Sequence, residues 1–278
     1  MADDSPLAFS LPAVSRKKVT AAFDGGRLSS DSGVTLLALA ERRRAVAGTL
    51  AALIADPRDP AHITHTVEDV LRARMLAIAC GYPDGNDFNF LRSDPAFKLA
   101  CGRLPETGDD LCSQPTISRW ENAPTLKEIV RLTYALVDIW CKSYTRPPAS
   151  VLLDLDDTLD VVHGRQKMAE WNAHYDERCF LPIHIYDTAT GRPVTMILRR
   201  RGLDIRYAVT SLKGSSADCI PSWHALRKTE FASIRLHLLK IAGRIVETAS
   251  RIRVALASCC PEAELFSLLA FQLQKSGP

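Results

Sequence analysis

The sequence lacks the features that mark membrane and exported proteins. None of its apolar runs reaches the roughly 18 residues that a membrane-spanning helix needs. The first residues, Met-Ala-Asp-Asp-Ser-Pro, are acidic and polar, so we expect no secretory signal. The sequence therefore predicts a cytoplasmic protein that has no membrane partner.

Paired metal-binding cysteines and a large net charge are also missing. The eight cysteines include no C-x-x-C pair, which argues against a zinc ribbon or a thioredoxin-type site and favours reduced thiols, several of them buried. The net charge is only +3, although residues 221–278 hold 8 basic and 4 acidic side chains. A net charge this small does not decide for or against nucleic-acid binding, because a local basic stripe is sufficient.

The composition is that of a soluble globular protein. Of 278 residues, 46% are apolar and 24% are charged, which is enough to bury a core in one large or two small domains. Helical patterns cover 34–143, and strand patterns then appear at 150–156, 179–186, 194–199 and 206–212. The predicted fold class is therefore α+β.

The same patterns divide the chain into three segments. An N-terminal arm and turn occupy 1–33, and a helical region with a DNA-binding segment occupies 34–146. The sheet and the C-terminal helices occupy 147–278. The boundary near 146 lies at Arg146-Pro147-Pro148, where the composition changes from helix-forming to strand-forming.

The C-terminal stretch carries the clearest helical periodicity. Apolar residues recur at steps of three and four from Thr229 to about Ala257, which predicts one long amphipathic helix. They are Phe231, Ile234, Leu238, Ile241, Ile245, Ala249, Ile252 and Leu256. Lys240, Arg244 and Arg251 fall on a different face of that helix, which either follows a DNA backbone or is an ordinary solvated face.

A short polar segment has the character of a DNA recognition helix. Residues 113–122 read Ser-Gln-Pro-Thr-Ile-Ser-Arg-Trp-Glu-Asn, with Ser113 as a cap and proline in the first turn. Gln114, Thr116, Ser118 and Arg119 are suited to base edges and phosphates. We predict helix-turn-helix-like DNA contact here, and an ordinary capped surface helix is the alternative.

An apolar strand runs directly into a cluster of acidic residues. Asp154 and Asp156 are two positions apart on this strand, so they project from the same face of the sheet. Two neighbouring carboxylates repel each other unless a cation lies between them, and a hard divalent cation such as Mg²⁺ takes oxygen ligands. We therefore predict a catalytic, metal-binding pair, with a solvated strand end as the alternative.

Two kinds of phosphoryl chemistry use such a strand. In an RNase H-like fold, acidic residues from separate elements hold two metal ions that activate the attacking oxygen and stabilise the leaving one. In haloacid-dehalogenase-type phosphatases the first motif is D-x-D-x-T, which residues 154–158 match, with Asp154 as nucleophile and Asp156 as general acid/base. The phosphatase is the weaker interpretation, because a long stretch precedes the strand and the later Asp204 and Asp218 are isolated from each other.

Five stretches together carry a family resemblance. They are Phe23–Gly33 (FDGGRLSSDSG), Ser113–Asn122 (SQPTISRWEN), Leu153–Gly164 (LDLDDTLDVVHG), Asn172–Tyr186 (NAHYDERCFLPIHIY) and Phe231–Ala270. In this order they resemble the bacterial insertion-sequence transposases with a group 1 DDE domain. The resemblance implies DNA transposition by an RNase H-like core that uses an Asp, Asp, Glu triad with Mg²⁺ or Mn²⁺. It also implies DNA as a partner, at the terminal inverted repeats of an insertion element, and association with a second copy or with an intact transposase.

The triad that the resemblance implies is incomplete in this sequence. Its first Asp maps to Asp154 or Asp156, with a slight preference for Asp156. The second Asp belongs in an Arg-Gly-Asp-Ser-type strand end, but no R-G-D occurs, and Glu230 lacks the residues expected around the Glu. The resemblance thus implies an internally shortened protein with an incomplete mixed sheet, an exposed sheet edge and weak or absent metal binding. Such a protein would be catalytically defective, and a non-catalytic DNA-binding fragment is the alternative.

Overall fold

The computed structural model describes residues 9–14, 17–21, 26–162, 169–198, 220–221, 223–229 and 231–275. They group into two compact units, one within Met1–Ala47, Arg58–Asn122 and Ile234–Pro278, the other within Gly48–Pro57 and Ala123–Ser233. These units divide the chain at other points than the predicted segments 1–33, 34–146 and 147–278, whose functional assignments stay predictions. The predicted strand 206–212, Asp204, Asp218 and Glu230 lie outside the described residues.

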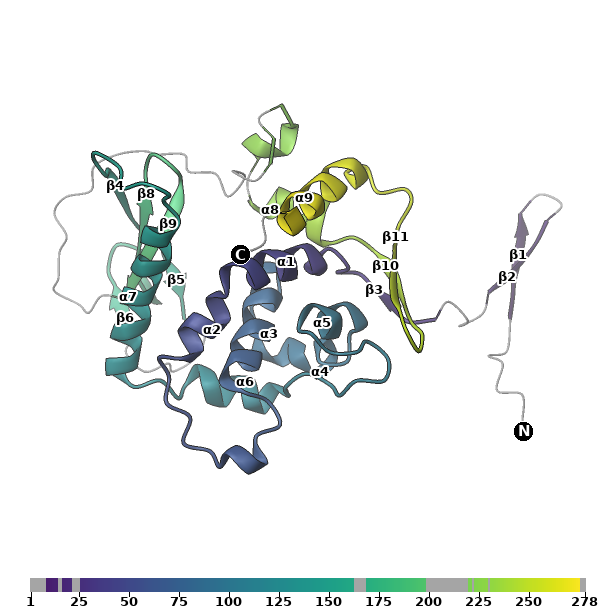
Figure 1. Ribbon diagram of the computed structural model, residues 1–278, viewed down its shortest axis with the longest axis horizontal. Helices are drawn as coiled ribbons and strands as arrows, with labels where there is room; N and C mark the ends of the chain where they lie inside the picture. Colours follow the sequence, from purple (N-terminus) through teal and green to yellow (C-terminus); the bar gives the residue numbers. More distant parts are fainter. Residues whose placement is uncertain are drawn as a thin grey trace. The chain divides into compact units, whose positions relative to one another are not determined.

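All the secondary-structure elements from residue 34 to residue 142 are helices, which confirms the helical region (Figure 1). They are α1 (Val34–Arg44), α2 (Val46–Ala51), η1 (Pro60–His62), α3 (Val67–Ala79), η2 (Gly85–Asp87), α4 (Phe88–Leu91), α5 (Pro95–Ala100), α6 (Gln114–Glu121) and α7 (Leu126–Lys142). Local chemistry sets several of their starts. At α3, the Thr66 hydroxyl accepts from the Asp69 N–H, and the Asp69 carboxylate accepts from the Thr66 N–H.

The first unit is built around one apolar core. Phe88, Phe97 and Ile117 have no exposed surface, and Tyr82 meets Phe97 edge-on with ring centroids 6.1 Å apart. Ile245, only 1% exposed, joins this core from a small sheet. Residues from the C-terminal part of the chain therefore complete the core of the N-terminal helices.

The predicted long helix from Thr229 to Ala257 is confirmed only in its first part and is wrong from Gly243 onward. In this segment the described residues are helical only in α8 (Phe231–Ile234) and the π-helical η4 (Arg235–Leu239). The chain then forms a hairpin of β10 (Gly243–Glu247) and β11 (Ile252–Leu256). Arginine and apolar residues alternate along 251–254, exposed and half-buried positions alternate along 251–256, and this period of two suits a strand. The hairpin forms because β10 can also pair with β3 (Leu28–Ser29), a contact from far along the chain. The C-terminal helices predicted within 147–278 include α9 (Ala263–Lys275).

Two glycines allow the C-terminal segment to approach the start of α1. A Cβ on Gly33 would lie 2.0 Å from the carbonyl oxygen of Leu238, and a Cβ on Gly243 would lie 2.2 Å from Ser32 Oγ. Side chains do not fit at such distances, so both positions require glycine for close packing.

The second unit contains two small antiparallel sheets. The first has the order β4–β8–β9, from β4 (Leu153–Asp157), β8 (Pro182–Asp187) and β9 (Arg192–Leu198), and α7 packs against β9. The second has the order β5–β7–β6, from β5 (Asp160–Val161), β7 (Glu177–Phe180) and β6 (Glu170–Asn172). β8 and β9 correspond to the strands predicted at 179–186 and 194–199, and they pair as an antiparallel hairpin.

These elements confirm the α+β class. Every strand pair among the described residues is antiparallel, including β1 (Phe9–Val14) with β2 (Lys17–Ala21). The mixed character predicted for the RNase H-like sheet stays a prediction, because the strand 206–212 would have to supply it. Within the described ranges, no helix combines the length and the apolar character needed to cross a bilayer.

We expect the buried cysteines to react much more slowly with alkylating reagents than the exposed ones. Burial is the main cause that raises the pKa of Cys80 and Cys101 to about 12 and that of Cys112 to about 11, so these thiols stay protonated at pH 8. Cys141 and Cys259 are exposed. Under native conditions iodoacetamide should modify the exposed pair first, as followed by peptide mass spectrometry, whereas in urea all five should react. Equal native rates at Cys80 and Cys141 would contradict this burial pattern.

Candidate functional site

Asp154 and Asp156 lie on one face of the β4–β8–β9 sheet, as predicted. They pair in register with Tyr186 and His184 of β8. The neighbouring Leu155 pairs with Ile185 and so points to the opposite face. Asp156 is exposed and Asp154 is half-buried. The two carboxylates therefore belong to the more open face of this sheet.

The opposite face of the sheet is covered by α7. Thr195 of β9, which pairs with Ile185, donates a 3.0 Å hydrogen bond from Oγ1 to the carbonyl oxygen of Thr133 in α7. Ile183 is only 4% exposed on this covered side. Because the helix holds one face, the carboxylates on the other face remain accessible to an external ligand.

One edge of β4 has no strand partner among the described residues. β4 pairs with β8 alone, and the apolar residues that lead into it, Val151, Leu152 and Leu153, are 43%, 56% and 38% exposed. The incomplete sheet with an exposed edge that the resemblance implies stays a prediction, because the strand predicted at 206–212 lies outside the described residues.

The metal ion that the sequence predicts would have two carboxylate ligands here, Asp154 and Asp156. No group of three His, Cys, Asp or Glu side chains within the described ranges could hold a metal ion. His184 pairs with Asp156 in register, but its ring is stacked on Tyr186, with centroids 6.3 Å apart and planes 11° apart. A two-ion centre needs more carboxylates than these, so the described residues do not fit one.

Asp187, at the end of β8, is a buried carboxylate that sequence reasoning missed. It has no exposed surface and accepts hydrogen bonds from Trp140 Nε1 at 3.2 Å, Thr190 Oγ1 at 2.6 Å, the Ala189 N–H at 3.1 Å and the Tyr144 hydroxyl. Burial acts to raise its pKa, but these donors together hold the pKa of Asp187 below its usual range. The Asp-x-x-Thr spacing after a strand was the available signal for this turn.

The predicted recognition helix exists as α6. Ile117 anchors it in the core, and Arg119 and Asn122 are exposed. The Arg119 Nε donates to the carbonyl oxygen of Pro115, and Ser113 and Thr116 share a hydroxyl contact of 3.2 Å. α5 ends at Ala100, well before α6, so the connection is longer than the short turn of a helix-turn-helix. DNA contact by Gln114, Thr116, Ser118 and Arg119 stays a prediction.

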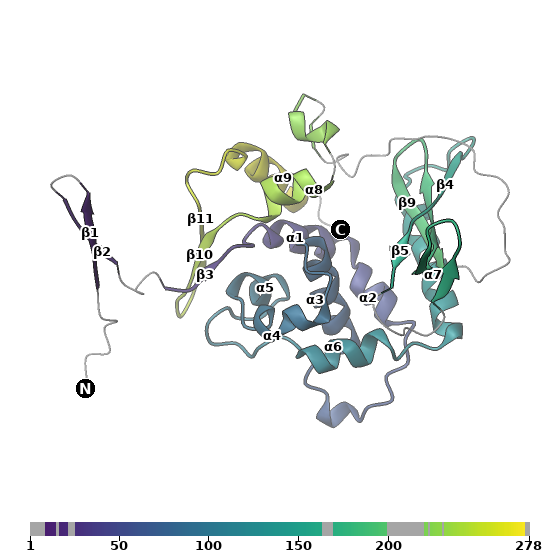
Figure 2. The same ribbon diagram turned by 180° about the vertical axis from the view of Figure 1, so that it is seen from behind.

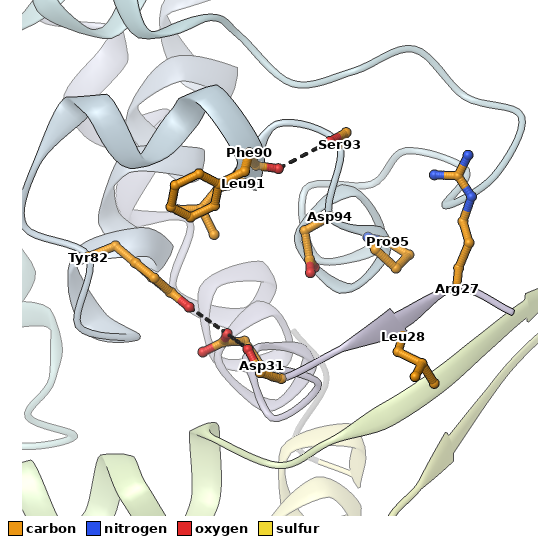
Figure 3. Close-up of a pocket in the computed structure, with 10 residues that line it drawn as sticks. Arg27, Leu28, Asp31, Tyr82, Phe90, Leu91, Ser93, Asp94 and Pro95 are labelled. Atoms are coloured by element: carbon orange, nitrogen blue, oxygen red, sulfur yellow. Dashed lines mark hydrogen bonds between the residues drawn. The ribbon is translucent and has the colours of Figure 1, made fainter. Parts of the chain in front are cut away.

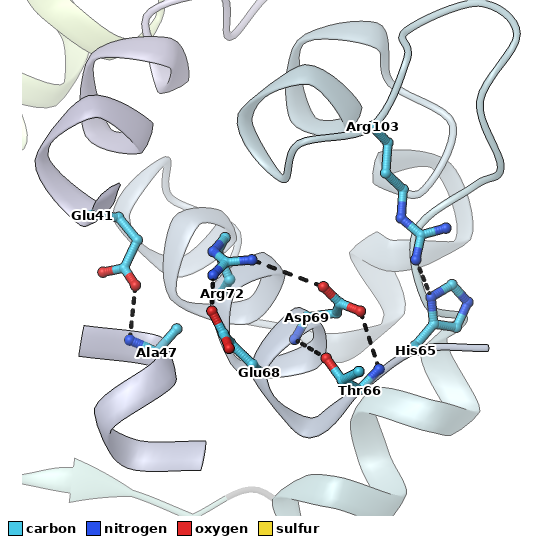
Figure 4. Close-up of polar contacts among 8 residues, drawn as sticks. All are labelled: Glu41, Ala47, His65, Thr66, Glu68, Asp69, Arg72 and Arg103. Atoms are coloured by element: carbon cyan, nitrogen blue, oxygen red, sulfur yellow. Dashed lines mark hydrogen bonds and ion pairs between the residues drawn. The ribbon is translucent and has the colours of Figure 1, made fainter. Parts of the chain in front are cut away.

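Charged residues at the start of α3 are engaged with one another rather than free for a ligand (Figure 4). Arg72 forms ion pairs with Glu68 and Asp69. Arg103 donates to His65 Nδ1 at 2.8 Å, and burial together with this arginine lowers the pKa of His65. These contacts tie the loop after α5 to the start of α3.

Lys240, Arg244 and Arg251 do not share a helix face, which corrects their predicted arrangement. Lys240 instead points toward the start of α1 within the first unit, where its Nζ lies 2.7 Å from Asp31 Oδ1 and 4.0 Å from the ring centre of Tyr82. Burial acts to lower the pKa of Lys240, but Asp31 and Tyr82 raise it overall. Lys240 is therefore a structural ion-pair partner, whereas Arg244 and Arg251 are exposed in the hairpin region.

A pocket of about 400 Å³ opens at Asp31, one partner of this ion pair (Figure 3). Its polar floor includes Asp31, to which Tyr82 donates at 2.8 Å, and Asp94, which caps α5 by accepting from the N–H groups of Ala96 and Phe97. Burial raises the pKa of Asp94. Both carboxylates are used in holding the fold, so we assign the pocket no chemistry.

Comparison with known proteins identifies one family. Residues 11–205 and 217–278 match the family model described as transposase DDE domain group 1. No curated protein and no solved structure matches the chain. The match spans the strand with Asp154 and Asp156, α6 and the C-terminal hairpin, and it leaves out the residues between 205 and 217.

Proposed function

The chain belongs to the transposases with a group 1 DDE domain, and on that premise we propose that Asp154 and Asp156 are the remaining metal-facing carboxylates of its catalytic sheet. The observation that carries this proposal is their shared, open sheet face, opposite the face that α7 covers. DDE transposases generally use divalent metal ions and act on DNA. The proposed DNA is the terminal repeat of an insertion sequence, bound by this chain with a second copy or with an intact transposase.

The proposed state of the catalytic centre is defective. Strand cleavage and transfer by two metal ions require at least three convergent carboxylates, which fix and neutralise the ions. Asp154 and Asp156 supply two, and the sequence has no R-G-D motif for the second Asp. A chain with this pair alone binds element ends without cutting them, and in that role it competes with an intact transposase.

A nicking assay on element-end DNA tests this proposal. The full chain is incubated with a labelled duplex that carries the inverted repeat flanking its gene, with Mg²⁺ or Mn²⁺, beside the D154N/D156N variant. We expect retention of the duplex and no metal-dependent nicking above the level of the variant. Nicking that the variant loses would show an active enzyme and overturn the defect, while failure to retain any duplex would overturn the DNA-binding role.

A further inference from the structure

The β10–β11 hairpin presents arginines on one face. Arg244 pairs with Ala255, and Val246 pairs with Arg253, so these four side chains project to the same side. Arg251 precedes β11 and follows the same alternation, with residues 251, 253 and 255 exposed and residues 252, 254 and 256 half-buried. We call Arg244, Arg251 and Arg253 the arginine face.

The opposite face of the hairpin is used by the core of the first unit. Ile245 pairs with Val254 there and is 1% exposed. The hairpin lies at the margin of the helices of this unit (Figure 2). Because one face is anchored, the arginine face is held outward in a fixed register rather than carried on a loose loop.

The described residues do not neutralise the positive charge of this face. None of the three arginines forms an ion pair among the residues that the structure describes. Glu247 is the only acidic residue of 243–256, and it is directed away, accepting hydrogen bonds from the Thr107 hydroxyl and the N–H groups of Glu106 and Thr107. The hydroxyl of Thr107 is the main cause that lowers the pKa of Glu247, which therefore stays charged and engaged.

The neighbouring strand adds an apolar border to this charge. Leu28 of β3 pairs with Arg244 and is 65% exposed, and the Arg244 guanidinium lies over Gly26. Arginines two residues apart on a strand are separated by about 6.8 Å. Such a short, basic, two-stranded ribbon matches a charged, extended polyanion better than it matches a compact ligand.

From charge complementarity, we infer that the arginine face contacts the phosphate backbone of double-stranded DNA. The inference rests on the proposed function, since that function supplies the DNA. The arginine face differs from the basic stripe predicted from the sequence, because it lies on a β-ribbon and not on a helix. It includes Arg253 and does not include Lys240. Phosphate contacts position a protein on DNA without reading its sequence, so the arginine face strengthens binding to any duplex equally.

The test is a salt titration of DNA affinity with the full chain and a fluorescent duplex that carries the element end. The R244A/R251A/R253A variant should bind on the order of tenfold more weakly or worse near 0.15 M salt. The slope of log affinity against log salt should become shallower by about 0.9 per arginine removed. The same fold-loss is expected on a scrambled duplex, and the R244K/R251K/R253K variant should stay close to the wild type.

A matched control removes three exposed cations elsewhere, in the variant K127A/R131A/K142A on α7. This control should keep most of the affinity, and circular dichroism and thermal melting should show that both triple variants fold. Wild-type affinity in the arginine-face variant, or an equal loss in the α7 control, would overturn the inference and leave the proposed function standing. If RNA competed better than duplex DNA, the assignment of double-stranded DNA as the ligand of the arginine face would be overturned. A wild-type chain that binds no DNA would refute both proposals.

Discussion

Replacing Lys240 with methionine is expected to lower the free energy of unfolding by up to about 3–5 kcal/mol, the typical cost of leaving a buried charge without its partner. Asp31 is 2% exposed, and Lys240 Nζ lies 2.7 Å from its Oδ1. Methionine has a similar length but no charge, so the variant leaves a carboxylate uncompensated in the core. Urea denaturation followed by circular dichroism measures the change.

A double variant separates the effect of the unpaired Asp31 charge on stability from the effect of altered packing at Lys240. Asp31→Asn removes the carboxylate, and the K240M/D31N variant should therefore recover part of the loss seen in Lys240→Met. Tyr82→Phe should cost less, about 1 kcal/mol, because it removes only a 2.8 Å hydrogen bond to Asp31. Additive losses in the double variant would show that Lys240 and Asp31 are not coupled.

Replacing Asp187 with asparagine should destabilise the second unit by about 3 kcal/mol, because hydrogen bonds to a charged group are worth about 1.5–3 kcal/mol each. The carboxylate is fully buried and accepts from Trp140, Tyr144, Thr190 and the Ala189 N–H. An asparagine amide nitrogen would face donors instead of accepting from them. Thr190→Val, which removes one donor, should show a smaller loss of about 1.5 kcal/mol and serves as the graded variant.

The same carboxylate predicts a dependence of stability on acid. Its pKa in the folded protein is lowered from the ordinary aspartate value, so its contribution is present in full above that ordinary value of about 4. The contribution is lost as the pH falls through the lower folded value. Urea midpoints between pH 3 and pH 7 should fall more steeply toward acid in the wild type than in Asp187→Asn, and parallel curves would contradict the role of Asp187.

Much of the helical region follows from chemistry within a few residues. Thr66 and Asp69 form a reciprocal cap, and proline at position 95 starts α5 after an Asp94 cap, so the ends of these helices are readable locally. The shared face of Asp154 and Asp156 was also readable, because the side-chain period of a strand is two. What α6 contacts was not readable, since that depends on a partner outside the chain.

The C-terminal segment shows where local reasoning failed. Apolar residues from Ile241 to Leu256 fit a helical stripe, yet the same segment also alternates in charge around Arg251 and Arg253. The sequence fits both the helical and the strand periodicity here, and pairing with β3 stabilises the strand. Local sequence does not report a partner that lies at the other end of the chain.

Short stretches of sequence were enough to predict the helices of 34–143, the strands that form β8 and β9, and the shared sheet face of Asp154 and Asp156. Only the tertiary structure shows that Lys240 neutralises Asp31 and that Asp187 accepts four hydrogen bonds. It also places Arg244, Arg251 and Arg253 on one open face. The reason is physical: periodicity and capping act within one or two turns, whereas burial and ion pairing depend on which distant segments exclude water together.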